Sequence, residues 1–318
     1  MSYCRKDKIN PLNASDAVIA DYLVYLFEVK NLLVNTIKVH RAAISSVVKH
    51  LRPEVLNSTT LKDLVHRLEL ERPRVKRVYP KFDLGLVLQQ FLKPPFTDSS
   101  GSDLKIPLKT LAYKTAFLLA LATGARVSEL HALSRHKSRF HMDTDEFSGK
   151  QTVTVFTKPE FLAKNEKPSE PKKPIVFSSL KHLYGPKEPE RLLCPVRAAI
   201  VYKSRTPDGM WPADREELLR HPVCTQNVTK GHIAEWIRNA IKLAYEAADQ
   251  GKIDCNAHEV RAVSHSLVAF SGATLEEVLE GGKWSSSGSF FRHYLRDMEH
   301  LRGMGVTVVA AGKQLQLQ

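Results

Sequence analysis

The sequence has few cysteines and no long apolar segment. Its four cysteines lie far apart and form no C-x-x-C pair, so their spacing indicates neither a zinc site nor a disulfide framework. No run of roughly 18 apolar residues occurs, as a transmembrane helix would need. The first residues, M-S-Y-C-R-K-D-K, lack the apolar core of a signal peptide. The sequence therefore predicts an intracellular protein with reduced cysteines and no membrane partner.

A metal-ligand pattern is also missing. His131, His136 and His141 recur at a spacing that does not stack side chains on one face of a helix. The acidic run D-T-D-E-F-S-G at 143–149 begins like a calcium loop but lacks its later glutamate. We therefore expect no metal ion and no other cofactor.

Acidic residues are outnumbered by basic ones. The 318 residues include 34 Asp and Glu against 47 Lys and Arg, a formal net charge of +13, and 43% are hydrophobic. The hydrophobic content is typical of a folded globular protein. The positive charge favours nucleic acid over an anionic membrane as partner, although many soluble proteins are basic for other reasons.

The apolar periodicity predicts a mainly α fold with a small β-sheet or hairpin (α+β), divided into two domains. Short amphipathic helices are expected at 15–29, 36–51 and 60–70, with Ser15 capping the first. Together they would form a small helical domain over residues 1–72.

A basic segment with two prolines follows at 73–81 and interrupts the helical pattern, which predicts a linker. Its charge suits a connection that faces DNA, although an ordinary solvated linker has the same composition. The candidate DNA-binding residues here are Arg72, Arg74, Lys76 and Arg77.

A larger mixed domain is expected over 82–300, followed by a tail at 301–318. Its centre is a helix that is apolar nearly all round and stops at Gly124, and Arg126 begins the next helix. Alternating residues predict two strands, at 151–156 and 174–177, joined by a long lysine-rich turn. Further helices are expected at 82–92, 195–203 and 229–248, then after Thr274 with its capping partner Glu277, and finally around Tyr294.

Two arginines, a histidine and a tyrosine in this domain suit phosphodiester chemistry. Cleavage through a covalent intermediate needs a nucleophile, positive charge at two non-bridging oxygens, and a proton donor for the leaving oxygen. Arg126 and Arg261 suit the second task, because a planar guanidinium binds phosphate bidentately. Tyr294 is the candidate nucleophile, and His258 lies one helical turn from Arg261. A lysine on the turn between the strands could supply the proton.

Three motifs resemble the tyrosine recombinases, also called the phage integrase family. They are A-T-G-A-R-V-S-E-L at 122–130, H-E-V-R at 258–261, and the tryptophan and tyrosine of W-S-S-S-G-S-F-F-R-H-Y at 284–294. The chain most resembles the recombinases of DIRS-like and Ngaro-like retrotransposons. The resemblance covers nearly the whole chain and implies a helical core-binding domain followed by a catalytic domain.

The resemblance implies a role for each matching residue. Arg126 and Arg261 would clamp the phosphate, and Glu129 would support the first of them. His258 would assist proton transfer. Tyr294 would form a 3′-phosphotyrosyl link.

Two further assignments leave alternatives open. Trp284 would take the position where relatives bond a phosphate oxygen, but Tyr294 lies one position farther along than is common in the family. Plain core packing is therefore the alternative role of Trp284. Lys158 directly follows the first predicted strand, as the family lysine does, and Lys164 in the same turn is its rival.

By resemblance, the expected activity is site-specific recombination of double-stranded DNA, serving the integration of a mobile element. Each transesterification conserves bond energy as phosphotyrosine, so neither a metal nor a nucleotide is needed, and no P-loop is present. A homo-tetramer on two DNA sites and a nuclear location are implied as well. The alternatives are a DNA-binding protein that keeps the fold without cleavage, and a monomeric enzyme like a type IB topoisomerase.

Overall fold

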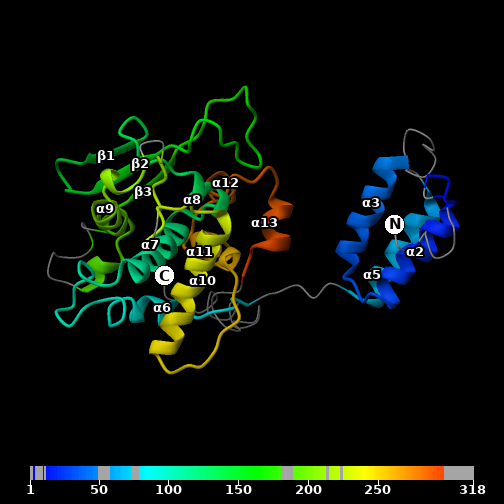
Figure 1. Ribbon diagram of the computed structural model, residues 1–318, viewed down its shortest axis with the longest axis horizontal. Coiled ribbons are helices and arrows are strands. Elements are labelled where there is room, and N and C mark those ends of the chain that lie inside the picture. Colours follow the sequence, from blue (N-terminus) through cyan, green and yellow to red (C-terminus); the bar gives the residue numbers. More distant parts are fainter. Residues whose placement is uncertain are drawn as a thin grey trace, which may run out of the picture. The chain divides into compact units, whose positions relative to one another are not determined.

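The computed structural model describes residues 3, 10, 12–48, 58–73, 79–180, 183, 189–212, 215–222 and 225–296. The chain forms two compact units, Met1–Lys76 and Arg77–Gln318 (Figure 1). As the sequence predicts, the fold is mainly helical with one small antiparallel sheet. None of the described helices is long and apolar enough to cross a membrane. The expected tail at 301–318 lies outside the described residues.

The smaller unit is built from α2 (Asp16–Glu28), α3 (Val34–Val48) and α5 (Thr59–Glu71), which confirms its three predicted helices. Ser15 caps α2 as expected, since its hydroxyl accepts a hydrogen bond from the backbone N–H of Val18 at 3.3 Å. One apolar face of each helix is buried in a common core. The core residues are Ile19, Leu23, Leu26, Phe27, Val34, Ile37, Val48, Leu61, Val65 and Leu68.

The larger unit is organised around the buried helix α7 (Leu108–Thr123), against which α9 (Pro195–Arg205), α10 (Lys230–Ala247) and α11 (Ala257–Phe270) pack (Figure 1). The apolar stripe predicted along α10 is buried against this centre. The remaining helices are α6 (Leu84–Gln90), α8 (Val127–Ala132), α12 (Leu275–Gly281), α13 (Ser287–His293) and the short 3-10 helices η1 (Pro189–Leu193) and η2 (Asp208–Met210).

The sheet has the order β1-β2-β3 and is antiparallel throughout. The strands β2 (Gln151–Val155) and β3 (Ile175–Ser178) confirm the two predicted ones. The sequence analysis does not predict the edge strand β1 (Phe140–Thr144), whose alternation of apolar and polar residues is short and whose residues are mostly exposed. The acidic run at 143–149 covers the end of β1 and the turn to β2, where Asp145 accepts a hydrogen bond from the N–H of Ser148 at 2.7 Å.

The end of α7 determines how the next helix starts. Gly124 caps α7 with a left-handed backbone at φ 57°, as the sequence predicts, and Arg126 then takes the N-cap position of α8. A Cβ atom on Gly124 would lie 2.1 Å from Cε1 of His265 on α11. Glycine therefore permits both the turn and the close approach of α11.

The last described helix ends one residue earlier than the sequence suggests. The prediction placed Tyr294 on a helix, whereas α13 stops at His293 and Tyr294 is its C-cap, with its N–H donating to the carbonyl of Phe290 at 2.9 Å. The preceding helix α12 begins with the predicted capping box of Thr274 and Glu277.

Candidate active site

Three of the predicted site residues surround the ring of Tyr294. The ring centroid of His258 lies 4.9 Å from that of Tyr294, and the ring centroid of Trp284 lies 4.8 Å away. Cζ of Arg261 is 5.4 Å from the centroid of the tyrosine ring. Helix α11 thus supplies an imidazole and a guanidinium, and the segment from α12 to α13 supplies the tryptophan and the phenol.

Arg261 is buried at 3% exposure and is held from two sides. Its terminal nitrogens donate to the carbonyls of Gly124 and Gly282, and its Cζ lies 4.7 Å from the ring of Trp284. Burial, followed by the positive charge of Arg126, lowers the pKa of Arg261 to about 10. The group therefore stays charged at neutral pH, and its Nε has no hydrogen-bond partner among the described residues.

Arg126 is positioned by Glu129. Its backbone N–H donates to Oε2 of Glu129 at 2.7 Å, and its guanidinium lies 3.8 Å from the same oxygen. The carboxylate is buried at 2% exposure, which fixes the start of α8. One terminal nitrogen of Arg126 is buried without a hydrogen-bond partner within the described part of the chain. This nitrogen could donate to an acceptor on a bound ligand.

His258 lies on α11 and is exposed, but the neighbouring residues shield part of its ring from water. This desolvation, followed by the positive charges of Arg261 and Arg126, lowers the pKa of His258 below its usual 6.5. The imidazole is therefore neutral at pH 7. A neutral imidazole beside a phenol can accept its proton.

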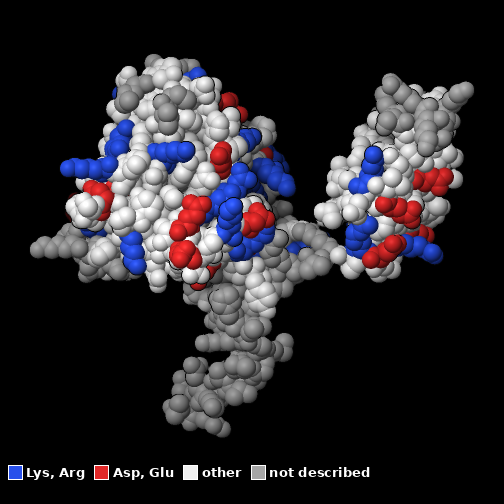
Figure 2. Space-filling view, turned by 60° about the horizontal axis from the view of Figure 1, so that its bottom comes forward, with Lys and Arg blue, Asp and Glu red and all other residues white. Residues whose placement is uncertain are grey.

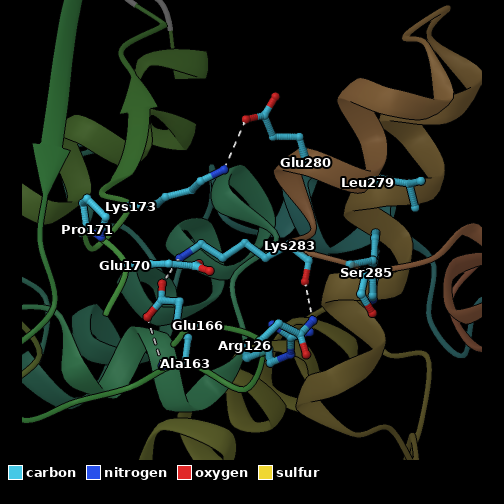
Figure 3. Close-up of a pocket in the computed structure, with 12 residues that line it drawn as sticks. Arg126, Ala163, Glu166, Glu170, Pro171, Lys173, Leu279, Glu280, Lys283 and Ser285 are labelled. Carbon is cyan, nitrogen blue, oxygen red and sulfur yellow. Dashed lines mark hydrogen bonds and ion pairs between the residues drawn. The ribbon is translucent and has the colours of Figure 1, made fainter. Parts of the chain in front are cut away.

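A cavity of about 410 Å³ opens beside Arg126 (Figure 3). The turn between β2 and β3 forms one wall, and the end of α12 with the residues after it forms another. Lys283 extends across the cavity to Glu166, with Nζ 3.1 Å from Oε1 (Figure 3). The lining residues are Arg126, Ala163, Asn165, Glu166, Glu170, Pro171, Lys173, Leu279, Glu280, Lys283, Trp284 and Ser285.

The two lysines expected on the turn lie elsewhere. Lys158 forms an ion pair with Glu217, and Lys164 is exposed. Neither is among the described residues that line the cavity. The turn itself is folded around Lys172, whose ammonium donates to the carbonyls of Lys158 at 2.8 Å and Phe161 at 2.5 Å.

The candidate DNA-binding residues of the linker can be placed only in part. The Cζ atom of Arg72 lies 3.9 Å from the ring centroid of Phe27, and its guanidinium donates to the carbonyl of Leu32 at 3.1 Å. These contacts tie the end of α5 to the turn after α2, and a DNA contact of Arg72 stays a prediction. Arg74, Lys76 and Arg77 lie outside the described residues.

Sequence reasoning missed His265. It is buried at 4% exposure, its Nδ1 lies 2.9 Å from the carbonyl oxygen of Arg261, and its ring centroid is 4.6 Å from that of Trp284. Desolvation lowers the pKa of His265 to about 4, so the ring is neutral and supports the tryptophan. Its position one turn after Arg261 on the same helix was the signal that could have identified it.

Arg296 was missed as well, and it anchors the chain just after Tyr294. Its guanidinium makes two hydrogen bonds to the buried carboxylate of Glu259, from Nε at 2.8 Å and from Nη2 at 3.2 Å. Its backbone N–H donates to the hydroxyl of Ser266 at 2.9 Å, and that hydroxyl lies 3.3 Å from the carbonyl oxygen of Tyr294. The segment carrying Tyr294 is thereby fastened to α11.

Within the described residues no three His, Cys, Asp or Glu side chains cluster as metal ligands. Cys194 and Cys255 are buried free thiols, while Cys4 and Cys224 lie outside the described residues.

No protein-family model matches the sequence, and no curated protein matches it. Solved structures do share its fold. The Tn1549 transposon integrase in complex with circular intermediate DNA is 12% identical with a TM-score of 0.54, over 95% of this chain and 86% of that one. The XerH site-specific recombinase bound to palindromic difH substrate, a post-cleavage complex, is 13% identical with a TM-score of 0.54, over 96% and 71%.

A lambda integrase dimer bound to a COC′ core site is also similar, at 14% identity and a TM-score of 0.50, over 95% of this chain and 89% of that one. The helical fold with its small antiparallel sheet is therefore the fold of these two integrases and of the XerH recombinase. At these identities the comparison establishes the fold.

Proposed function

We propose that a protein with this fold and this site breaks and rejoins double-stranded DNA through a 3′-phosphotyrosyl intermediate, as a site-specific recombinase. The observation that carries the proposal is the surrounding of Tyr294 by His258, Trp284 and the buried guanidinium of Arg261. The likeness to integrases and a recombinase solved with DNA supports it.

Arg126 and Arg261 would bind the non-bridging oxygens of the scissile phosphate. Both guanidinium groups are largely buried, each has a nitrogen without a hydrogen-bond partner among the described residues, and each charge acts on the other. An anion between them would relieve this repulsion and accept the free N–H groups. Glu129 fixes the position of Arg126, while the carbonyls of Gly124 and Gly282 fix that of Arg261.

The reaction follows from these positions. The phenol oxygen of Tyr294 attacks the phosphorus while its proton passes to His258, and the bond to the 5′-oxygen breaks. The charge that develops on the phosphate is stabilised by the two guanidinium groups. The leaving oxygen takes a proton from a lysine, for which the sequence predicts Lys158 or Lys164. Rejoining is the reverse sequence with a new 5′-hydroxyl.

Trp284 would hold the nucleophile and the clamp together. Its ring contacts Tyr294, the guanidinium of Arg261 and the supporting ring of His265. The ring contact between Trp284 and Tyr294 supports this role although the spacing of the two residues is one position longer than is common in the family.

The wider setting is also part of the proposal and is supported by the sequence resemblance. The unit with α2, α3 and α5 would serve as a core-binding domain, and the basic segment at 73–81 would cross the duplex. Figure 2 shows Lys and Arg gathered on the visible face of the larger unit, with fewer Asp and Glu among them. A tetramer acting on two sites, integration of a retrotransposon of the DIRS or Ngaro type, and a nuclear location complete the proposal.

A pool of randomised duplexes that carry a nick close to the cleavage position would test this function. After cleavage, the short strand fragment between the cleavage position and the nick diffuses away with the 5′-hydroxyl that rejoining needs. Wild-type protein should therefore accumulate a covalent adduct, and Tyr294→Phe should form none. Tight binding without an adduct would instead favour the non-cleaving DNA-binding alternative. Adducts from a monomer that also relaxes any supercoiled plasmid would favour an enzyme like a type IB topoisomerase.

A further inference from the structure

We propose that Lys283 is the residue that protonates the leaving 5′-oxygen. This inference rests on the proposed function and assigns to a different residue the role that the sequence gives to Lys158 or Lys164. The reason is position. Lys283 lies in the cavity that Arg126 opens into, and the two expected lysines do not line it.

One carboxylate connects Lys283 to the phosphate clamp. The ammonium of Lys283 lies 3.5 Å from Oε1 of Glu129, while Arg126 lies 3.8 Å from Oε2 of the same side chain. The two cations therefore face the same small region from two sides. The side chain of Lys283 is 19% exposed, so substrate can reach a group that is otherwise enclosed.

The neighbours of Lys283 in the chain belong to the site as well. The carbonyl of Gly282 accepts a hydrogen bond from Arg261, and the ring of Trp284 covers Arg261 and Tyr294. The carbonyl of Lys283 itself accepts a hydrogen bond from Asn165 at 2.6 Å. The backbone of Lys283 is thus fixed between the clamp and the nucleophile.

This backbone has a conformation that lysine rarely adopts. Lys283 has φ 49°, and the other described non-glycine residues with positive φ are Asn31 and Asp249, types that tolerate it better. Lys283 follows Gly282, the C-cap of α12, and its N–H donates to the carbonyl of Glu280 at 2.9 Å, so the positive φ belongs to the turn that ends this helix. Glycine at this position would keep the turn.

Without DNA, Lys283 pairs with Glu166, and a bound phosphate could replace this partner. Glu166 lies on the turn between β2 and β3, and its pKa is lowered, against the opposing effect of its burial, by hydrogen bonds from the N–H of Ala163 and from Lys283. Its pairing with Lys283 at 3.1 Å is on the cavity side (Figure 3). A phosphodiester bound at Arg126 would compete for this contact, since its two non-bridging oxygens also share one negative charge.

The proton balance of the step is complete with these residues. The phenol of Tyr294 gives its proton to His258 as the phosphorus–oxygen bond to tyrosine forms. The bond to the 5′-oxygen breaks, its electron pair stays on that oxygen, and the ammonium of Lys283 donates a proton to it. The products are a 3′-phosphotyrosine, a free 5′-hydroxyl, a neutral lysine and an imidazolium, and rejoining returns both protons.

Two variants separate a proton donor from a structural residue. Lys283→Gly removes the ammonium and relieves the positive φ, so the backbone gives no reason for misfolding. Lys283→Arg keeps the positive charge but does not release a proton. Lys173→Ala is the matched control, because Lys173 lines the same cavity, pairs with Glu280 at 3.6 Å and is 68% exposed.

Adduct formation should be timed on a nicked duplex of a sequence recovered from wild-type adducts, and on the same duplex with sulfur in place of the 5′-bridging oxygen. A thiolate leaves without a proton, so the sulfur substrate does not need the acid. On the oxygen substrate we expect both Lys283 variants to be slower by about a hundredfold or more, and on the sulfur substrate by less than about tenfold. Lys173→Ala should remain close to wild type on both, and neither Lys158→Ala nor Lys164→Ala should show a loss that the sulfur substrate rescues.

The assignment to Lys283 is overturned if its variants are equally slow on both substrates, or if Lys158→Ala or Lys164→Ala shows the loss and the sulfur rescue instead. Either result would leave the tyrosine-linked reaction of the wild-type protein intact. A wild-type protein that forms no adduct would overturn the proposed function together with this inference.

Discussion

Gly124 links the fold to the phosphate clamp, so its replacement by alanine should damage both. Its left-handed backbone at φ 57° disfavours any Cβ atom, at a cost of about 1–2 kcal/mol. The added Cβ would also lie 2.1 Å from Cε1 of the buried His265, and such overpacking typically costs about 1–3 kcal/mol more. We therefore expect Gly124→Ala to lower the free energy of unfolding by about 2–5 kcal/mol.

Gly149→Ala is the control that isolates the clash. Gly149 has φ 64°, close to that of Gly124, but a Cβ atom added there would meet no other atom within 4 Å. Gly149→Ala should therefore lower the free energy of unfolding only by the cost of the left-handed backbone, about 1–2 kcal/mol. Urea unfolding followed by tryptophan fluorescence measures both, because all three tryptophans of the chain lie in the larger unit.

A double-mutant cycle tests whether His265 is the cause. If the ring of His265 causes the additional loss, Gly124→Ala should be less harmful in a His265→Ala background, by about 1–3 kcal/mol. Gly124→Ala should also slow adduct formation, because the carbonyl of Gly124 accepts a hydrogen bond from Arg261. Equal losses for Gly124→Ala and Gly149→Ala would refute the clash with His265 as the cause of the additional loss.

Three further outcomes are expected. Arg296→Met leaves the buried carboxylate of Glu259 without its guanidinium and should cost about 3–5 kcal/mol in urea unfolding, whereas a loss below about 1 kcal/mol would contradict the anchoring role. Because the pKa of His265 falls from 6.5 to about 4 on folding, the unfolded chain binds the proton more readily, and stability present above pH 6.5 should decline by about 3 kcal/mol towards pH 4. A His265→Asn variant should lack this part of the pH dependence, and an unchanged profile would contradict it. Lys172→Met removes the donor to the carbonyls of the β2–β3 turn, so limited proteolysis should cut that turn faster than in wild type, and an unchanged rate would refute this role.

The sequence predicts best what depends on neighbouring residues. The stop of α7 at Gly124, the cap of α2 by Ser15 and the capping box of Thr274 and Glu277 all follow from local backbone chemistry, and the structure confirms each. The strand β1 was missed, since its alternation of apolar and polar residues is short and its side chains are mostly exposed.

Pairings between distant residues could not be predicted. Nothing in the sequence shows that Lys158 meets Glu217 or that Lys283 meets Glu166, because a charged residue in a loop has many possible partners. The pairing of Arg296 with Glu259 was equally invisible. In contrast, His258, Arg261, Trp284 and Tyr294 could be selected together, since the resemblance to the tyrosine recombinases ties their order along the chain to one reaction.

The most direct test of the proposed chemistry is the identity of the bond between protein and DNA. Adducts trapped on the nicked duplex should be digested and the DNA-bearing peptide sequenced by mass spectrometry. We predict that the DNA is joined through its 3′-phosphate to the oxygen of Tyr294 and that the cleaved strand carries a free 5′-hydroxyl. DNA joined to another residue, a 5′-phosphate link, or cleavage that persists in Tyr294→Phe would contradict the assignment of Tyr294 as the nucleophile.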